Sequence, residues 1–271
     1  MKIAVLILTR GRPAGLIGAI QSFHATASGE HAVEYVVCGD DDDPTLEQAQ
    51  ELLEHLPITW SINPRPDALG NAWTLGARAC EWDVALFTGD DTVPATWHWD
   101  RRMADNAASA PAFAWTEAND PTNCTYWATT RRWHDAVGRA APDLFPYWFN
   151  DTWTAEQHLF AFGHPIPIDR HLVMAGRRGT TREMREVAFW FDVFAATRPQ
   201  RIAEAARIAR AYGVAPPDAA PLLDWCARWD AEQRDAVPRY NVAFAADTVP
   251  PTARYNRLRA RAAALLEMVP A

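Results

Sequence analysis

Residues 84–91 read VALFTGDD, an apolar run that ends in a glycine and two adjacent aspartates, Asp90 and Asp91. An uninterrupted apolar run bounded by a turn residue is typical of a strand buried on both faces of a parallel sheet. Two neighbouring carboxylates at the end of such a strand repel each other, and a divalent cation with oxygen ligands would neutralise them. We therefore expect an acidic site at this strand end, against the plainer interpretation of a solvated turn.

The residues before this strand repeat a pattern of strand, polar loop and helix. Strands are expected at 3–8, 33–37 and 58–62, and helices at 16–23, 46–56 and 69–80. This alternation favours a parallel sheet covered by helices. Ligands of such sheets bind beyond the carboxyl ends of the strands. The polar residues that follow each strand are therefore candidates for one shared site.

The strand and helix candidates after residue 97 are shorter and less regular. Strands or extended segments are expected at 113–115, 125–129 and 165–174, and helices at 133–137, 153–163, 183–195, 201–212, 222–234 and 254–268. We expect two halves of one domain, at 1–110 and 111–178, and a helical C-terminal extension at 179–271.

Composition narrows the classes of function. The 271 residues carry a net charge of −8, which disfavours a bulk electrostatic grip on nucleic acid or on an anionic membrane. The four cysteines are scattered, so neither a zinc site nor a disulfide framework is indicated. No apolar run reaches the length of a membrane span. We expect a soluble, cytoplasmic protein.

Two further strand ends carry polar motifs. Asp40 and Asp41 directly follow the second strand, where a carboxylate can accept a hydrogen bond from the imide N–H of a base. Residues 9–13, TRGRP, join the first strand to a helix, whose first backbone amides with a nearby arginine can bind an anion or a nucleotide. A solvated loop and an ordinary strand–helix turn are the plainer interpretations.

Four segments together resemble a family-two glycosyltransferase with the GT-A fold, namely residues 7–13 (ILTRGRP), 36–41 (VVCGDD), 69–73 (LGNAW) and 87–91 (FTGDD). The resemblance implies a Rossmann-like, mostly parallel sheet with flanking helices. It implies that Asp90 contacts the ribose and that Asp91 ligates Mn²⁺ or Mg²⁺. The implied nucleotide-sugar site contains Thr9, Arg10, Arg12, Asp40, Asp41, Asn71 and Asp90. This family often has a third acid before the pair, at the position that Gly89 occupies here.

A looser resemblance extends to the second half of the chain. In residues 150–153, NDTW, it implies that Asp151 is the general base, although a helix cap is the alternative. It also implies a histidine ligand to the metal, His171, with Asp169 as its substitute. Aromatic side chains are expected to line the acceptor side, in particular Trp127, Trp148 and Trp153.

The function implied is an inverting, metal-dependent transfer of a sugar from a nucleoside-diphosphate sugar, with a UDP-sugar favoured, to a hydroxyl group of a glycan. Hydroxymethylated bases of phage DNA are the alternative acceptor. A nucleotidyltransferase would open with a glycine-rich loop and a lysine, but here the first loop has only Gly11 and no nearby lysine. A non-catalytic nucleotide- or carbohydrate-binding module is the remaining class. The sequence does not indicate the oligomeric state.

Overall fold

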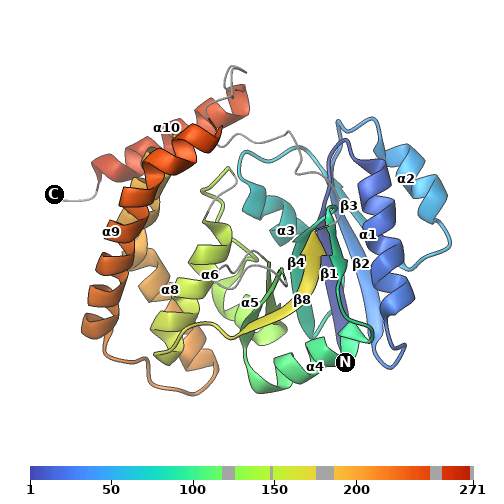
Figure 1. The fold of residues 1–271 in the computed structure, drawn as a ribbon, viewed down its shortest axis with the longest axis horizontal. Coiled ribbons are helices and arrows are strands. Elements are labelled where there is room, and N and C mark those ends of the chain that lie inside the picture. Colours follow the sequence, from blue (N-terminus) through green and yellow to red (C-terminus); the bar gives the residue numbers. More distant parts are fainter. Residues whose placement is uncertain (118–125, 147–148, 175–185, 245–251, 269–271) are drawn as a thin grey trace. The chain divides into compact units, whose positions relative to one another are not determined.

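The structure, a computed structural model, describes residues 1–117, 126–146, 149–174, 186–244 and 252–268 (Figure 1). The chain forms two compact units. Unit 1 comprises residues 1–66, 71–141 and 166–179, and unit 2 comprises residues 67–70, 142–165 and 180–271. Our three-part division at residues 110 and 178 stays a prediction.

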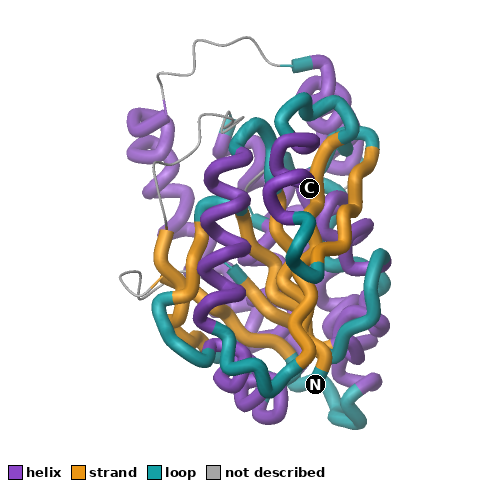
Figure 2. The backbone as a smooth tube through the Cα atoms, turned by 90° about the vertical axis from the view of Figure 1, so that its right-hand side faces the viewer, coloured by secondary structure: helices purple, strands orange, loops and turns teal. Residues whose placement is uncertain are grey.

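Unit 1 is built on one sheet, visible as neighbouring strands in Figure 2. Its strands are β1 (Lys2–Leu8), β2 (Ala32–Asp40), β3 (Ile58–Asn63), β4 (Val84–Gly89), β5 (Thr92–Pro94), β6 (Ala112–Glu117), β7 (Trp127–Thr130) and β8 (Ile168–Met174). The spatial order is β3-β2-β1-β4-β7-β6-β8-β5. Strands β3, β2, β1 and β4 are parallel, whereas β7 is antiparallel to β4 and β6, β8 is parallel to β6, and β5 is antiparallel to β8.

The helices of unit 1 are α1 (Pro13–Thr26), α2 (Leu46–Leu53), α3 (Leu69–Arg78, whose first two residues belong to unit 2), α4 (Trp99–Ser109) and α5 (Arg131–Val137). Helix α1 begins at Pro13, because the fixed φ of proline suits the first turn and its missing N–H needs no partner there. Leu16, Ile20 and Phe23 of α1 are buried in one core with β1 and β4. This core holds the carboxyl ends of the parallel strands in fixed positions.

Unit 2 is helical over its described residues. Its helices are α6 (Asn150–Phe162), α7 (Val187–Ala196), α8 (Arg198–Ala211), α9 (Ala219–Phe244) and α10 (Ala253–Glu267). Its core is rich in aromatic side chains, with Phe145, Phe149, Trp153, Trp190 and Phe194 at 8% exposure or less. Among the helices that the structure describes, none is both long and apolar enough to cross a bilayer.

The structure confirms the α/β class, the four parallel strands and the helical C-terminal extension. It adds strand β5 and helix α4, which the sequence pattern did not indicate. Helix α4 reads WDRRMADNAAS and buries only Trp99, Asp100 and Met103, so its apolar spacing is too sparse to recognise. Thr45 occupies the N-cap position of α2, and its hydroxyl group donates to Asp43 Oδ1 at 2.8 Å instead of capping the helix.

Candidate functional site

Three adjacent parallel strands end at one edge of the sheet of unit 1. Leu8, the last residue of β1, lies opposite Cys38 of β2 and opposite Gly89 of β4. The backbone continues this pairing one residue further, because Thr9 N–H donates to the Cys38 oxygen at 3.2 Å and Asp90 N–H donates to the Leu8 oxygen at 3.1 Å. The polar residues that follow the three strands therefore meet at this edge.

Asp90 is held inside this edge by two neighbours. Its side chain has no exposed surface. The Thr9 hydroxyl donates to Asp90 Oδ2 at 2.7 Å, and Arg12 Nε donates to the same oxygen at 3.1 Å. Arg12 Nη2 pairs with the other oxygen, Oδ1. Burial raises the pKa of Asp90 to about 6, while the Thr9 hydrogen bond and the Arg12 charge oppose this rise.

Asp91 is the more accessible acid of the pair. Its side chain is 19% exposed, and Arg12 Nη1 lies 3.3 Å from its Oδ2. The Tyr126 hydroxyl lies 3.5 Å from Asp91 Oδ1, at the outer limit of a hydrogen bond. A Cβ atom at Gly89 would stand 3.0 Å from Oδ1. A side chain at position 89 would therefore crowd the Asp91 carboxylate.

Gly15 brings the first turn of α1 against the loop after β4. A Cβ atom at this position would lie 2.9 Å from the backbone oxygen of Asp90, closer than real Cβ atoms approach. Glycine therefore permits a contact that any other residue would widen. As a result, the amino end of α1 packs closely against the backbone that carries Asp90.

Asp40 forms a second acidic position, also held by arginines. Arg10 Nη1 donates to Asp40 Oδ2 at 3.0 Å, Arg10 Nη2 donates to Asp42 Oδ2 at 3.1 Å, and Arg65 Nε lies 3.4 Å from Asp40 Oδ2. Burial raises the pKa of Asp40, and the Arg10 hydrogen bond opposes the rise. The Asp41 side chain is exposed. Asp40, one of the two aspartates predicted to contact a base, is therefore held by both Arg10 and Arg65. We call Thr9, Arg10, Arg12, Asp40, Asp42, Asp90 and Asp91 the strand-end cluster.

Two residues at this edge, Asp43 and Arg65, were not predicted as site residues from the sequence. Asp43 is 7% exposed and accepts a hydrogen bond from Gly11 N–H at 2.7 Å, so it ties the loop after β2 to the loop after β1. Its other oxygen accepts from Thr45 N–H at 3.0 Å, a local turn that the order Asp-Pro-Thr could have indicated. Arg65 stands between two prolines after β3, and only its position at a strand end pointed to the site.

Asn71, the remaining predicted donor contact in unit 1, lies in the first turn of α3 and is partly buried. Two residues on, Trp73 donates its indole N–H to the Thr88 oxygen of β4 at 3.2 Å. That hydrogen bond fixes α3 beside the strand that ends in the acidic pair.

His171 lies apart from Asp91. Ala95 N–H donates to the His171 oxygen, which places His171 four residues along the β5 segment from Asp91. The imidazole is engaged on both sides, with Nδ1 2.7 Å from Thr96 Oγ1 and Nε2 2.6 Å from Asp169 Oδ1. Burial lowers the pKa of His171, and Asp169 opposes this effect. The structure does not bring the predicted histidine ligand, or Asp169, to the acidic pair.

The fit of a divalent ion can be judged from these positions. Within the described residues, no three His, Cys, Asp or Glu side chains form a group that could hold a metal ion. Asp90 is enclosed, whereas Asp91 is partly open. Mg²⁺ is commonly bound by one or two carboxylates together with substrate phosphates and water. Within the described residues, the site therefore fits an ion at Asp91 only if ligands from outside the protein complete its coordination.

Asp151 lies in unit 2, in the first turn of α6. Thr152 N–H donates to its Oδ1 at 2.8 Å. Removal from water raises the pKa of Asp151 to about 6, against the effect of this hydrogen bond. The N-cap position belongs to Phe149, in the left-handed region at φ 68°, so neither Asp151 nor Thr152 occupies it. Stacking of Phe149 on Phe194 at 4.9 Å helps to hold that strained backbone immediately before the acid.

The predicted aromatic platforms need correction. Trp127 is 1% exposed and stacks on Phe87 with ring centroids 5.6 Å apart, inside unit 1. Trp153 is also 1% exposed, and its indole N–H donates to Glu204 Oε2 at 2.9 Å, inside unit 2. Neither ring offers a free face to an acceptor, so both act in packing. Trp148 lies outside the described residues.

Parallel strands in the order β3-β2-β1-β4, with acids and arginines gathered at their carboxyl edge, define a Rossmann-like α/β unit. No family model and no curated protein matches the chain. Among solved structures, the chain is similar to residues 1–349 of TarS from S. aureus in complex with UDP-GlcNAc, with 14% identity over 77% of this chain and 70% of that chain and a TM-score of 0.57.

A second similar structure is the mannosyltransferase PcManGT from Pyrobaculum calidifontis in complex with GDP-Man and Mn²⁺. It is 13% identical over 97% of this chain and 84% of that chain, with a TM-score of 0.51. At such identities these likenesses show the fold alone. The fold is GT-A: a mostly parallel sheet with flanking helices, followed here by a C-terminal helical extension.

Proposed function

We propose that this chain is a glycosyltransferase that moves a sugar from a nucleoside-diphosphate sugar to a hydroxyl group of a glycan. The observation that carries the proposal is the strand-end cluster, in which one arginine bridges Asp90 and Asp91 and a second bridges Asp40 and Asp42 at a single edge of the sheet. Such an edge is where sheets of this class bind nucleotides. The GT-A fold supports the same proposal.

A UDP-sugar is the donor that we propose. Asp40 is a partly buried carboxylate beside the loop after β1, and a carboxylate there can accept the imide N–H of uracil. TarS, with UDP-GlcNAc, and PcManGT, with GDP-Man, show that the fold serves more than one nucleotide. The donor panel described below therefore includes both nucleotides.

The residues divide the chemistry as follows. Asp90 would bind the ribose, and Asp91 would hold Mn²⁺ or Mg²⁺, an ion that, when bound, would offset negative charge on the diphosphate leaving group. Asp151, largely ionised at neutral pH with a pKa of about 6, takes the proton of the acceptor hydroxyl group as that group attacks the anomeric carbon. Attack opposite the leaving group in a single displacement inverts the configuration.

The donor assignment is tested by incubating the protein with UDP- and GDP-sugars and Mn²⁺. We expect slow release of free nucleoside diphosphate and a rise in melting temperature with one donor class. No release and no thermal shift with any donor would contradict the proposal. Glucosylation of hydroxymethylated DNA, but of no glycan, would replace the proposed acceptor with the DNA base.

The base assignment is tested by Asp151→Asn. Since general base catalysis contributes roughly 10²- to 10⁴-fold, transfer should fall by at least about 100-fold while donor binding persists. Asp224→Asn, which removes an exposed carboxylate of the same unit, is the matched control. Normal transfer by Asp151→Asn would assign the base elsewhere.

A further inference from the structure

Arg12 places three nitrogen atoms on the acidic pair. Nε and Nη2 contact the two oxygens of Asp90, and Nη1 lies 3.3 Å from Asp91 Oδ2. A planar guanidinium matches a carboxylate in this forked geometry better than any other side chain. The arginine thus occupies an oxygen of the residue that we propose as metal ligand.

The charges around Asp91 show how this contact would affect the binding of a cation. Asp90 and Asp91 together carry two negative charges, and Arg12 supplies the positive charge that the described ion pairs bring to them. The other arginine of this loop, Arg10, is engaged by Asp40 and Asp42. A divalent cation on Asp91 would meet a like charge within a few ångströms. The cation and the guanidinium therefore cannot share Asp91 Oδ2 without mutual repulsion.

The Arg12 side chain has room to move away from the acidic pair. Its side chain is 34% exposed, and it stands at the N-cap position of α1 without a capping hydrogen bond of its own. Asp90 would stay in place, since Thr9 donates to its carboxylate and its backbone N–H is bonded to Leu8. A diphosphate that arrives at the amino end of α1 would give the guanidinium a new anionic partner.

We infer that Arg12 is an internal cation that competes with the divalent ion for Asp91. In the free protein the arginine offsets one of the two negative charges of the pair and keeps the affinity for the metal low. One part of this inference rests on the proposed function: the diphosphate of the donor draws Arg12 away from Asp91. Metal binding would then depend on the presence of the donor. The competition itself is a property of the protein alone.

The test is a titration with Mn²⁺ without nucleotide, with free ion followed by electron paramagnetic resonance. Arg12→Met should bind Mn²⁺ at least tenfold more tightly than the unmodified protein. Arg101→Met removes the same charge from an exposed pair with Glu30 and should change the affinity less than twofold. Arg12→Gln, which can keep a hydrogen bond to Asp90, serves if the methionine variant does not fold.

Adding Asp91→Asn to Arg12→Met should abolish the gain, which locates the ion. Unchanged Mn²⁺ affinity in both Arg12 variants, or a gain that survives Asp91→Asn, would overturn the inference. Repeating the titration with UDP or GDP separates the two proposals. If nucleotide tightens Mn²⁺ binding by the unmodified protein, both proposals are supported. If Arg12→Met raises the Mn²⁺ affinity but nucleotide does not change it, the competition is supported and the donor assignment is contradicted.

Discussion

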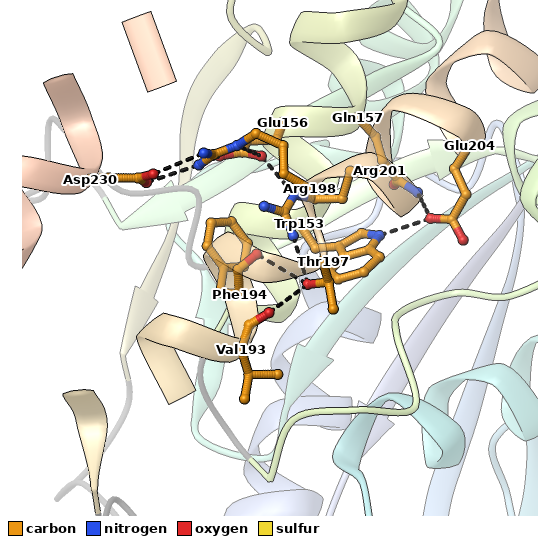
Figure 3. A network of polar contacts seen from close by, with 10 residues as sticks. All are labelled: Trp153, Glu156, Gln157, Val193, Phe194, Thr197, Arg198, Arg201, Glu204 and Asp230. Carbon is orange, nitrogen blue, oxygen red and sulfur yellow. Dashed lines mark hydrogen bonds and ion pairs between the residues drawn. The ribbon is translucent and has the colours of Figure 1, made fainter. Parts of the chain in front are cut away.

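Two clusters of arginines and carboxylates in this chain use the same chemistry in opposite settings. In unit 2, Arg201 has no exposed surface, and its Nε contacts Glu156 Oε2 at 2.6 Å. Arg198 bridges Glu156 to Asp230 with a pair of 2.8 Å contacts to Asp230 (Figure 3). We call Glu156, Arg198, Arg201, Glu204 and Asp230 the helix cluster. The strand-end cluster of unit 1 instead leaves its arginines 28–34% exposed.

The difference lies in what completes each cluster. The helix cluster is closed by its own unit: Trp153 and Gln157 donate to Glu204 at 2.9 and 2.6 Å, and the Arg201 guanidinium lies 3.8 Å from the Phe194 ring centre (Figure 3). Helices α6, α8 and α9 supply its charges. The strand-end cluster ends instead at an accessible Asp91. The first arrangement stabilises a packing of helices, and the second leaves a charged face that is partly open to solvent.

The largest effect that we expect is a fall in the free energy of unfolding when an ion pair of the helix cluster is broken. Glu156→Gln leaves Arg201 buried beside a neutral partner, and breaking a buried pair costs about 3–5 kcal/mol. The free energy of unfolding, measured by denaturant titration with tryptophan fluorescence, checks this value. Asp91→Asn, the counterpart from the strand-end cluster, should cost about 1 kcal/mol, because this pair is partly open to solvent and Arg12 keeps its contacts with Asp90. Equal losses in the two variants would remove the distinction.

The next effect is on the pH dependence of transfer. In its proposed role as base, Asp151 would act only when ionised, and its pKa of about 6 lies above the usual value for aspartate. The active form therefore prevails above pH 6 and is lost below it, so kcat should fall about tenfold between pH 7 and pH 5. Donor affinity should be followed in parallel by thermal shift, since Asp90 titrates in the same range. A kcat that is flat from pH 7 to pH 5 would exclude Asp151 as the titrating base.

The sequence predicted more of the local framework than of the site. The strands up to β4 were predictable because each is a continuous apolar run that ends at a polar turn, and the strand-end acids followed from topology. His171 could not be placed, because its position depends on the register between β8 and β5, and β5 has only three residues. Trp127 and Trp153 were misassigned for another reason. An indole suits a core as well as a binding face, and only the packing around it decides which.

The smallest effect that we expect comes from alanine substitutions at two glycines of α1, Gly15 and Gly18. Gly15 contacts the backbone of the strand-end cluster, whereas Gly18 does not. Alanine favours a helix over glycine by about 1 kcal/mol. At Gly18 a Cβ atom meets nothing within 4 Å, so Gly18→Ala should raise the free energy of unfolding by up to about 1 kcal/mol. At Gly15 the same methyl group presses on the Asp90 backbone, and the strain should cancel the gain or reverse it.

The two alanine variants also distinguish an effect on the site from an effect on the stability of helix α1. Gly15→Ala pushes the first turn of α1 away from the loop that carries Asp90 and Asp91, so donor affinity should fall several-fold. Gly18→Ala, one turn further along the same helix, should bind the donor as the unmodified protein does. Isothermal titration with the nucleotide that passes the donor screen measures both. Equal donor affinities in the two variants would show that the contact of α1 with the Asp90 backbone does not shape the site.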